Sequence, residues 1–125
     1  MDRPAFAQFA PGYRLGRMAT QVIQVQVAHE DRDALQRIIT TLVDERLIAC
    51  GQIAGPVSST FFWAGGVQDS EEWLGLLKTG AGTVDRLVAR IAELHSYEVP
   101  EILAITFCGG YAPYLEWVTQ RTKPG

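Results

Sequence analysis

Two stretches of this chain place apolar residues at helical spacing along one side only, and this pattern restricts the possible folds more than any other feature. The first consists of Leu35, Ile38, Ile39, Leu42 and Val43, and the second of Val84, Leu87, Val88, Ile91 and Leu94. Positions i, i+3, i+4 and i+7 share one face of a helix, so each segment has a single stripe to bury. We therefore expect two amphipathic helices that pack against the same sheet.

The ends of both helices are also marked. Asp31 and Asp33 offer carboxylates to the free N–H groups at the start of the first helix, and Thr83 is suited to cap the second. Pro100 disfavours helical geometry at the residue before it, so the second helix is not expected to extend far past His95.

Extended segments separate these helices. Residues 22–27 and 102–108 are rich in β-branched residues and predict strands, the second of them buried. A short helix that carries Tyr114, Leu115, Trp117 and Val118 is expected to end the fold. If two further strands lie between the helices, the order is β-α-β-β-α-β, which is the ferredoxin-like α+β arrangement of four antiparallel strands.

The region between the two helices supports two interpretations. Residues 48–63 favour extended structure, and Ala64, Gly65 and Gly66 form a turn signal. Residues 70–74 resemble a capped helix start, although Gly75 disfavours a helix. If residues 67–79 form a strand instead, the two arms make a hairpin roughly 40 Å long that would overhang so small a domain. Pro56 cannot donate to a sheet ladder, so its strand is expected to be bulged or at an edge there.

Composition indicates one globular domain. Of 125 residues, 47% are apolar and 20% are charged, and we predict an N-terminal arm over residues 1–20 followed by a domain over residues 21–125. A net charge of -3 with scattered Lys and Arg argues against nucleic-acid binding. No apolar run approaches the ~20 residues that span a bilayer, and the first residues lack the core of a secretory signal. Two distant cysteines, Cys50 and Cys108, suit a reducing compartment, so we expect a cytoplasmic protein.

Five short strings, in order and in spacing, resemble the signatures of the CutA (divalent-cation tolerance) family. They are Leu47-Ile48-Ala49-Cys50, Ser59-Thr60-Phe61-Phe62-Trp63-Ala64-Gly65, Leu77-Lys78-Thr79, His95-Ser96-Tyr97-Glu98-Val99-Pro100-Glu101-Ile102 and Tyr114-Leu115-Glu116-Trp117. A single string of this kind would mean little, but all five in register span about residues 22–118.

The resemblance implies a tight homotrimer in which long hairpins pair with neighbouring protomers, an architecture similar to that of PII-type signalling trimers. It also implies a role in tolerance of divalent cations, with copper bound by some members. A physical argument agrees with the trimer, because an uncovered hairpin would leave backbone groups unpaired and invite aggregation. The alternative is a PII-like regulatory or scaffolding trimer that binds a small anionic ligand or a partner protein in clefts between subunits.

Imidazole, thiolate and carboxylate groups are ligands of divalent metals, and the candidates for copper or another divalent cation are His95, Cys50 and Glu98. The chain departs from the family pattern at Ser96, where Pro is expected. The ligands of copper-binding bacterial members, a Cys on the first strand and a His-His pair, correspond here to Val27, Leu94 and His95. A lone imidazole is a poor copper site. Local hydrogen bonding by His95 and an apolar, buried role for Cys50 are therefore the alternatives.

Further residues are candidates for a cleft or interface between subunits, namely Trp63, Lys78, Tyr97, Glu101 and Trp117. Trp63 could stack on a ligand or be buried by a neighbouring protomer. Lys78 could bind an anion or be solvated at the end of its strand. No triad of nucleophile, base and acid follows from the spacing, and no cofactor is indicated apart from copper or another divalent cation, so we predict a protein without catalytic activity.

Overall fold

The computed structural model describes residues 13–15 and 21–122. In chain order the elements are β1 (Tyr13–Leu15), β2 (Val22–His29), α1 (Arg32–Asp44), β3 (Cys50–Trp63), β4 (Gly66–Gly80), the 3-10 helix η3 (Ala81–Thr83), α2 (Val84–Leu94), β5 (Ile102–Thr106), β6 (Gly109–Tyr111) and α3 (Ala112–Arg121). The predicted arm over residues 1–20 lies outside the described residues, apart from β1, which pairs with β6 in a small antiparallel sheet.

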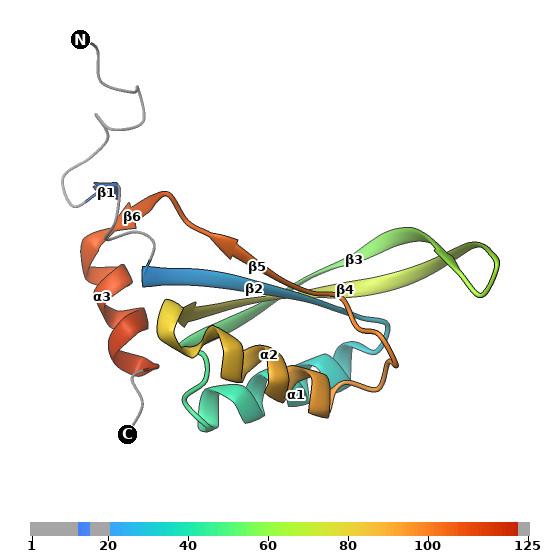
Figure 1. Cartoon of the computed structure of the whole chain (residues 1–125), viewed down its shortest axis with the longest axis horizontal. Helices are drawn as coiled ribbons and strands as arrows, with labels where there is room; N and C mark the ends of the chain where they lie inside the picture. The colour runs from blue at the N-terminus through green and yellow to red at the C-terminus, as the bar shows by residue number, and fades with distance from the viewer. Residues whose placement is uncertain (1–12, 16–20, 123–125) are drawn as a thin grey trace, which may run out of the picture.

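The main sheet has four antiparallel strands in the order β3-β4-β2-β5. Helices α1 and α2 lie together on one face of it (Figure 1). This confirms the ferredoxin-like α+β fold expected from the order of elements. Of the described helices, none is both long enough and apolar enough to cross a membrane.

The core lies between the sheet and the two helices. Alternate β2 residues, Ile23, Val25 and Val27, point into it, where they meet the apolar stripes of α1 and α2. Leu35 and Ile91, one from each helix, are fully buried there. The stripe on each helix therefore packs as its spacing predicts, apart from Val88, which does not join the core cluster.

The opposite face of the sheet is covered only at one end. There Val22 and Ala49 pack against Leu115 and Val118 of α3. On the same face of β5, Leu103 and Ile105 stay open to solvent and are 53% and 42% exposed. The sequence predicted a buried strand in this region. That prediction is wrong within one protomer, because β5 is an edge strand with helices on one side only.

Strands β3 and β4 form the long hairpin, so the helical interpretation of residues 70–74 is wrong. The hairpin extends well past the helices (Figure 1). Its register shifts between Ala54 and Val57, around Pro56, and β3 is an edge strand, as the proline predicted. Ala64 and Gly65 turn the chain with positive φ angles of 52° and 81°.

The helix starts match the sequence only in part. Asp31 caps α1, because its Oδ1 accepts from the Ala34 N–H at 3.0 Å. Thr83 occupies the cap position of α2, but its hydroxyl donates to the Thr122 carbonyl and makes no cap bond. The reason is the 3-10 turn before α2, which buries Thr83 against the end of α3.

Candidate functional site: a histidine cluster beside an acidic, aromatic groove

Two imidazole rings stack where β2 ends. His29 is the last residue of β2 and His95 follows α2, and their ring centroids lie 4.4 Å apart. The ring of Tyr97 packs edge-on against His95 at 4.5 Å. Both histidines are buried, at 3% and 7% exposed. Folding thus joins a strand end to the segment after α2, which lies more than sixty residues away along the chain.

Hydrogen bonds to the backbone hold both rings in a fixed orientation. In His95, Nδ1 accepts from the Tyr97 N–H at 3.1 Å, so Nε2 carries the proton and donates to the Ala28 carbonyl at 2.7 Å. In His29, Nδ1 accepts from the Asp31 N–H at 2.9 Å, and Nε2 lies 3.4 Å from the Ser96 hydroxyl. Burial lowers the pKa of His29 below 6.5, and His95 lowers it further.

Tyr97 ties this cluster to the hairpin. Its hydroxyl accepts from the Glu30 N–H at 2.8 Å and donates to Oε2 of Glu72 on β4 at 3.1 Å. Burial raises the pKa of Tyr97 to about 12. The phenol therefore stays protonated and can keep donating to the carboxylate.

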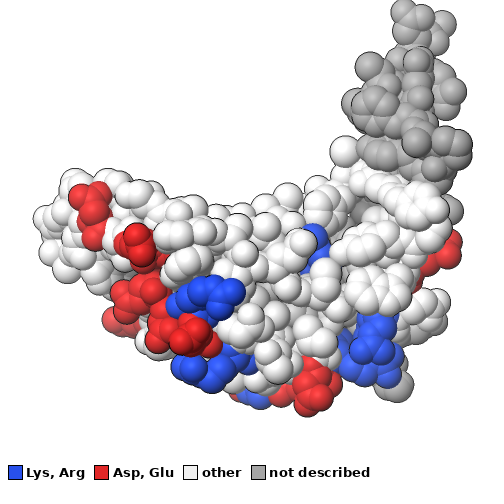
Figure 2. All heavy atoms as spheres, turned by 180° about the vertical axis from the view of Figure 1, so that it is seen from behind, with Lys and Arg blue, Asp and Glu red and all other residues white. Residues whose placement is uncertain are grey.

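A groove of about 690 Å³ opens between the hairpin and the segment that follows Tyr97. The hairpin contributes Phe61, Phe62, Trp63 and Glu72, and the facing segment contributes Tyr97, Glu98 and Glu101. No Lys, Arg or His is among the lining residues in the described part of the chain. Figure 2 shows red but no blue atoms along the outer part of the hairpin. The groove is therefore both acidic and aromatic.

A second polar cluster lies at the other end of the sheet, beside α3. The Cys50 sulfur is 3.3 Å from the Tyr114 hydroxyl, and Cys50 is paired in register with Lys78. Lys78 is only 9% exposed, and its Nζ donates to Oε1 of Gln52 at 3.0 Å. Burial lowers the pKa of Lys78. Burial also raises the pKa of Tyr114 to about 12, with a further contribution from Cys50.

The candidates predicted from sequence therefore fall into two groups. Trp63, Tyr97, Glu98 and Glu101 meet in the groove, with His95 directly behind Tyr97. Cys50, Lys78 and Trp117 lie toward α3, where Trp117 packs against Tyr114 with their centroids 5.7 Å apart. Lys78 is buried, contrary to the solvated alternative, because the adjacent strand and α3 enclose the end of β4.

One protomer does not bring the three predicted metal ligands together. Cys50 pairs with Lys78, and Lys78 pairs with Gln24 of β2 on its other side. His95 bonds instead to Ala28 of β2, and the positions of Gln24 and Ala28 are roughly 13 Å apart at ~3.3 Å per residue. Within the described part of the chain, no three His, Cys, Asp or Glu side chains are grouped to hold a metal. His95 would also have to give up one of its backbone hydrogen bonds to bind an ion.

His29 and Glu72 belong to the site but were not singled out from the sequence. His29 is the last residue of strand β2, just before the Asp31 cap. Its position at the end of a strand was the only feature of the sequence that could have indicated a role in the site. Glu72 lay in the segment whose structure was ambiguous. Ser96, which stands where the family pattern has Pro, contacts His29 through its hydroxyl. This departure from the pattern therefore coincides with the histidine pair.

The fold and groove define a class: an α+β protein with ferredoxin-like topology, an elongated central hairpin and a terminal helix on the open face of the sheet. The family pattern described as "CutA1 divalent ion tolerance protein" matches residues 23–121. The chain belongs to the CutA family.

Relatives and solved structures agree with this assignment. The divalent-cation tolerance protein CutA of Thermus thermophilus is 35% identical over 102 residues, which cover 82% of this chain and 97% of that protein. The chloroplastic CutA 1 of Oryza sativa is 34% identical over 101 residues, which cover 81% of this chain. This chain spans only 57% of the length of that plant relative.

The structural similarity is equally broad. The crystal structure of CutA1 from Oryza sativa superposes with a TM-score of 0.80 at 31% identity and covers 86% of this chain and 99% of that one. For Cut A1 of Thermus thermophilus the TM-score is 0.78 at 34% identity, covering 81% of this chain and 98% of that one.

Proposed function

We propose that this chain is a homotrimeric divalent-cation tolerance protein whose working form is the assembly. The observation that carries the proposal is the hairpin. From the Val57–Glu72 pair to the Trp63–Gly66 pair, its strands pair only with each other among the described strands. An isolated two-stranded hairpin is at best marginally stable in water. The hairpin therefore needs a partner surface.

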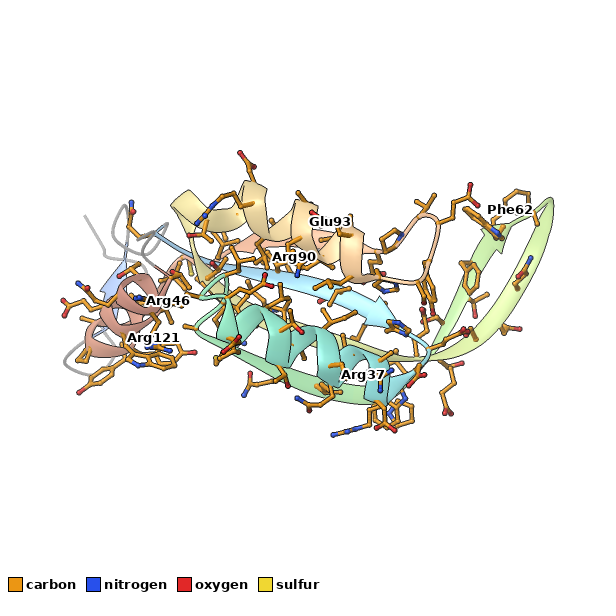
Figure 3. The ribbon with its side chains drawn as sticks, turned by 90° about the horizontal axis from the view of Figure 1, so that it is seen from below. Arg37, Arg46, Phe62, Arg90, Glu93 and Arg121 are labelled. Atoms are coloured by element: carbon orange, nitrogen blue, oxygen red, sulfur yellow. The ribbon has the colours of Figure 1, made fainter. Side chains whose placement is uncertain are left out.

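Apolar side chains on the hairpin support the same conclusion. Phe62 and Val67 face each other across the two strands and are 73% and 74% exposed. Figure 3 shows Phe62 near the tip of the hairpin, beyond both helices. The open face of the sheet adds Leu103 and Ile105. Apolar surface of this extent on a small domain is typical of an interface.

A ring of identical chains accounts for both surfaces. The hairpin tip of one protomer is a different surface from the open sheet face, so contacts between copies would be head-to-tail, and these close when the rotation forms a ring. The number of three follows from the resemblance to the CutA family.

The role in divalent-cation tolerance rests on the family and on the names of relatives such as the Thermus thermophilus protein. We propose that a divalent cation, copper included, binds weakly and between protomers, where His95, Cys50 or Glu98 of different copies could approach one another. The separation of these residues within one protomer is the reason for placing the site at an interface. No contact in the described residues favours the anion-binding, PII-like alternative, and we do not propose it.

Light scattering tests the assembly, and calorimetry tests the cation. We expect a particle of three 13.8 kDa chains, about 41 kDa. We also expect copper or zinc to release heat that is reduced in both Cys50→Ser and Glu98→Gln. A mass of one chain would contradict the trimer. Negligible heats for the unchanged protein and both variants would contradict the metal role and leave the trimer standing.

A further inference from the structure

The groove beside Tyr97 has the chemistry of a binding site for a ligand other than a metal ion. Its volume of about 690 Å³ falls in the range of sites that enclose small organic molecules. A single metal ion needs its ligands to converge on one point. In the described residues, Glu72, Glu98 and Glu101 are not grouped in that way. The negative charge is instead spread along the groove.

Two of these carboxylates are held in place. Glu72 accepts from the Tyr97 hydroxyl at 3.1 Å, and Glu101 accepts from the Gln26 side-chain amide at 3.1 Å. Both bonds come from neutral donors, so they orient the carboxylates without neutralising their charge. The chain also contains no Lys or Arg between residues 51 and 77 or between residues 95 and 120. Neither wall of the groove thus supplies its own counter-cation.

Aromatic rings supply the rest of the wall. Phe61 and Trp63 are 41% and 48% exposed, so their rings are available to a ligand. Because strand side chains alternate, these two rings lie on the opposite face of the hairpin from Phe62 and Val67, although Phe62 also borders the groove. An interface built on the latter pair therefore leaves the face that carries Phe61 and Trp63 available. Aromatic faces beside carboxylates attract organic cations through their electron-rich rings.

We propose that this groove binds an elongated organic cation, a linear di- or polyamine with ammonium groups spaced along a methylene chain. The ammonium groups pair with Glu72, Glu98 and Glu101, and the methylene chain lies against Phe61 and Trp63. Ammonium groups that are spaced along a chain can each pair with a different carboxylate of the groove. A single metal ion cannot reach carboxylates that are spread out in this way. Binding needs no bond-making step and no cofactor.

Isothermal titration of the assembled protein with 1,8-diaminooctane tests the proposal, and 1,8-octanediol is the uncharged control of the same length. We expect saturable binding of the diamine and none of the diol. The double variant Glu98→Gln and Glu101→Gln should bind the diamine at least about tenfold more weakly. The matched control, Asp44→Asn with Asp85→Asn, removes the same charge from the ends of α1 and α2 and should bind as the unchanged protein does.

The signals of two tryptophan side chains test where the diamine binds. In a nitrogen-15 spectrum the diamine should shift the indole N–H signal of Trp63 and leave that of Trp117, which lies on α3, unchanged. Equal binding of diol and diamine, or equal affinity in both double variants, would overturn the proposal. The proposal would also be overturned if the protein does not bind the diamine but binds copper in a way that depends on Glu98 and Glu101. None of these results depends on the mass that tests the trimer.

Discussion

At the scale of single residues, backbone hydrogen bonds fix the orientation of the two stacked histidine rings. Both Nδ1 atoms accept from backbone N–H groups, of Asp31 for His29 and of Tyr97 for His95. A proton placed on either Nδ1 would face a donor instead of an acceptor and would break that bond. The bond from His95 Nε2 to the Ala28 carbonyl fastens the segment after α2 to the end of β2, and the two Nδ1 bonds hold the rings in the orientation that allows it.

We expect the stability of the protein to depend on the protonation of His29. Because burial and His95 hold its pKa below the value of 6.5 that it has when unfolded, the unfolded chain takes up the proton first as the pH falls. The free energy of unfolding should be at its full value above about pH 6.5 and should decrease below it, toward the lower folded pKa. The carboxylates of Glu30, Asp31 and Glu72 oppose the shift without reversing it.

Urea unfolding at one protein concentration, followed by tryptophan fluorescence between about pH 8 and pH 5, measures this dependence. His29→Gln keeps an acceptor for the Asp31 N–H but has no titrating group, so its loss of stability over this range should be smaller. An identical slope in the variant would show that other groups, and not His29, cause the dependence.

The backbone at residue 51 lies so close to core side chains that only glycine fits there without displacing them. A Cβ added there would lie 2.7 Å from Cγ2 of Ile39 and 3.0 Å from Cδ2 of Leu77, both in the core. We expect Gly51→Ala to lower the free energy of unfolding by about 1–3 kcal/mol, because overpacking forces these side chains to shift. Gly82→Ala, where nothing lies within 4 Å, is the control and should change stability by less than about 1 kcal/mol. Equal effects would refute a packing cause.

At the scale of elements, the cap of α1 is the clearest case of a local signal that the structure confirms. Asp31→Ala should cost about 0.5–2 kcal/mol because the Ala34 N–H loses its acceptor. Asp31→Asn keeps an acceptor oxygen and should retain most of the stability. Thermal unfolding of the two variants measures the difference, and an Asn variant as unstable as the Ala variant would point to the charge and not to the cap.

Elements with local signals could be predicted, and those that depend on distant contacts could not. The local sequence was sufficient to predict the apolar stripes of α1 and α2 and the turn at Gly65, because each of these signals lies within a short segment of the chain. Strand β4 was ambiguous because Ser70, Glu71 and Glu72 imitate a helix start, and only pairing with β2 and β3 settles its structure. Strand β5 is apolar but is not buried within one protomer. Its composition alone does not distinguish a strand buried in its own core from an apolar strand left exposed in one protomer.

The same limit applies to the site. The motif after α2 placed Tyr97, Glu98 and Glu101 close together in sequence, so their shared location could be anticipated. His29 and Glu72 reach the site only through the register of β2 against β4. The order of residues along the chain does not show which residues of two different strands will lie side by side.

At the scale of the whole molecule, the account depends on the hairpin being completed by other copies of the chain. The two most exposed apolar side chains of the hairpin, Phe62 and Val67, form one cross-strand pair outside the core of the protomer. Replacing both with Asp should therefore leave the protomer folded while it places charge in the interface. The matched control, Gln36→Asp with Thr40→Asp, adds the same charge to the exposed side of α1.

The most direct test is the mass in solution of these proteins, measured by sedimentation equilibrium alongside circular dichroism. We predict about 41 kDa, three 13.8 kDa chains, for the unchanged protein and for the α1 control. For the Phe62→Asp and Val67→Asp variant we predict 13.8 kDa with unchanged secondary structure. A 13.8 kDa mass for the unchanged protein, or a trimer that persists when this pair is charged, would contradict the account.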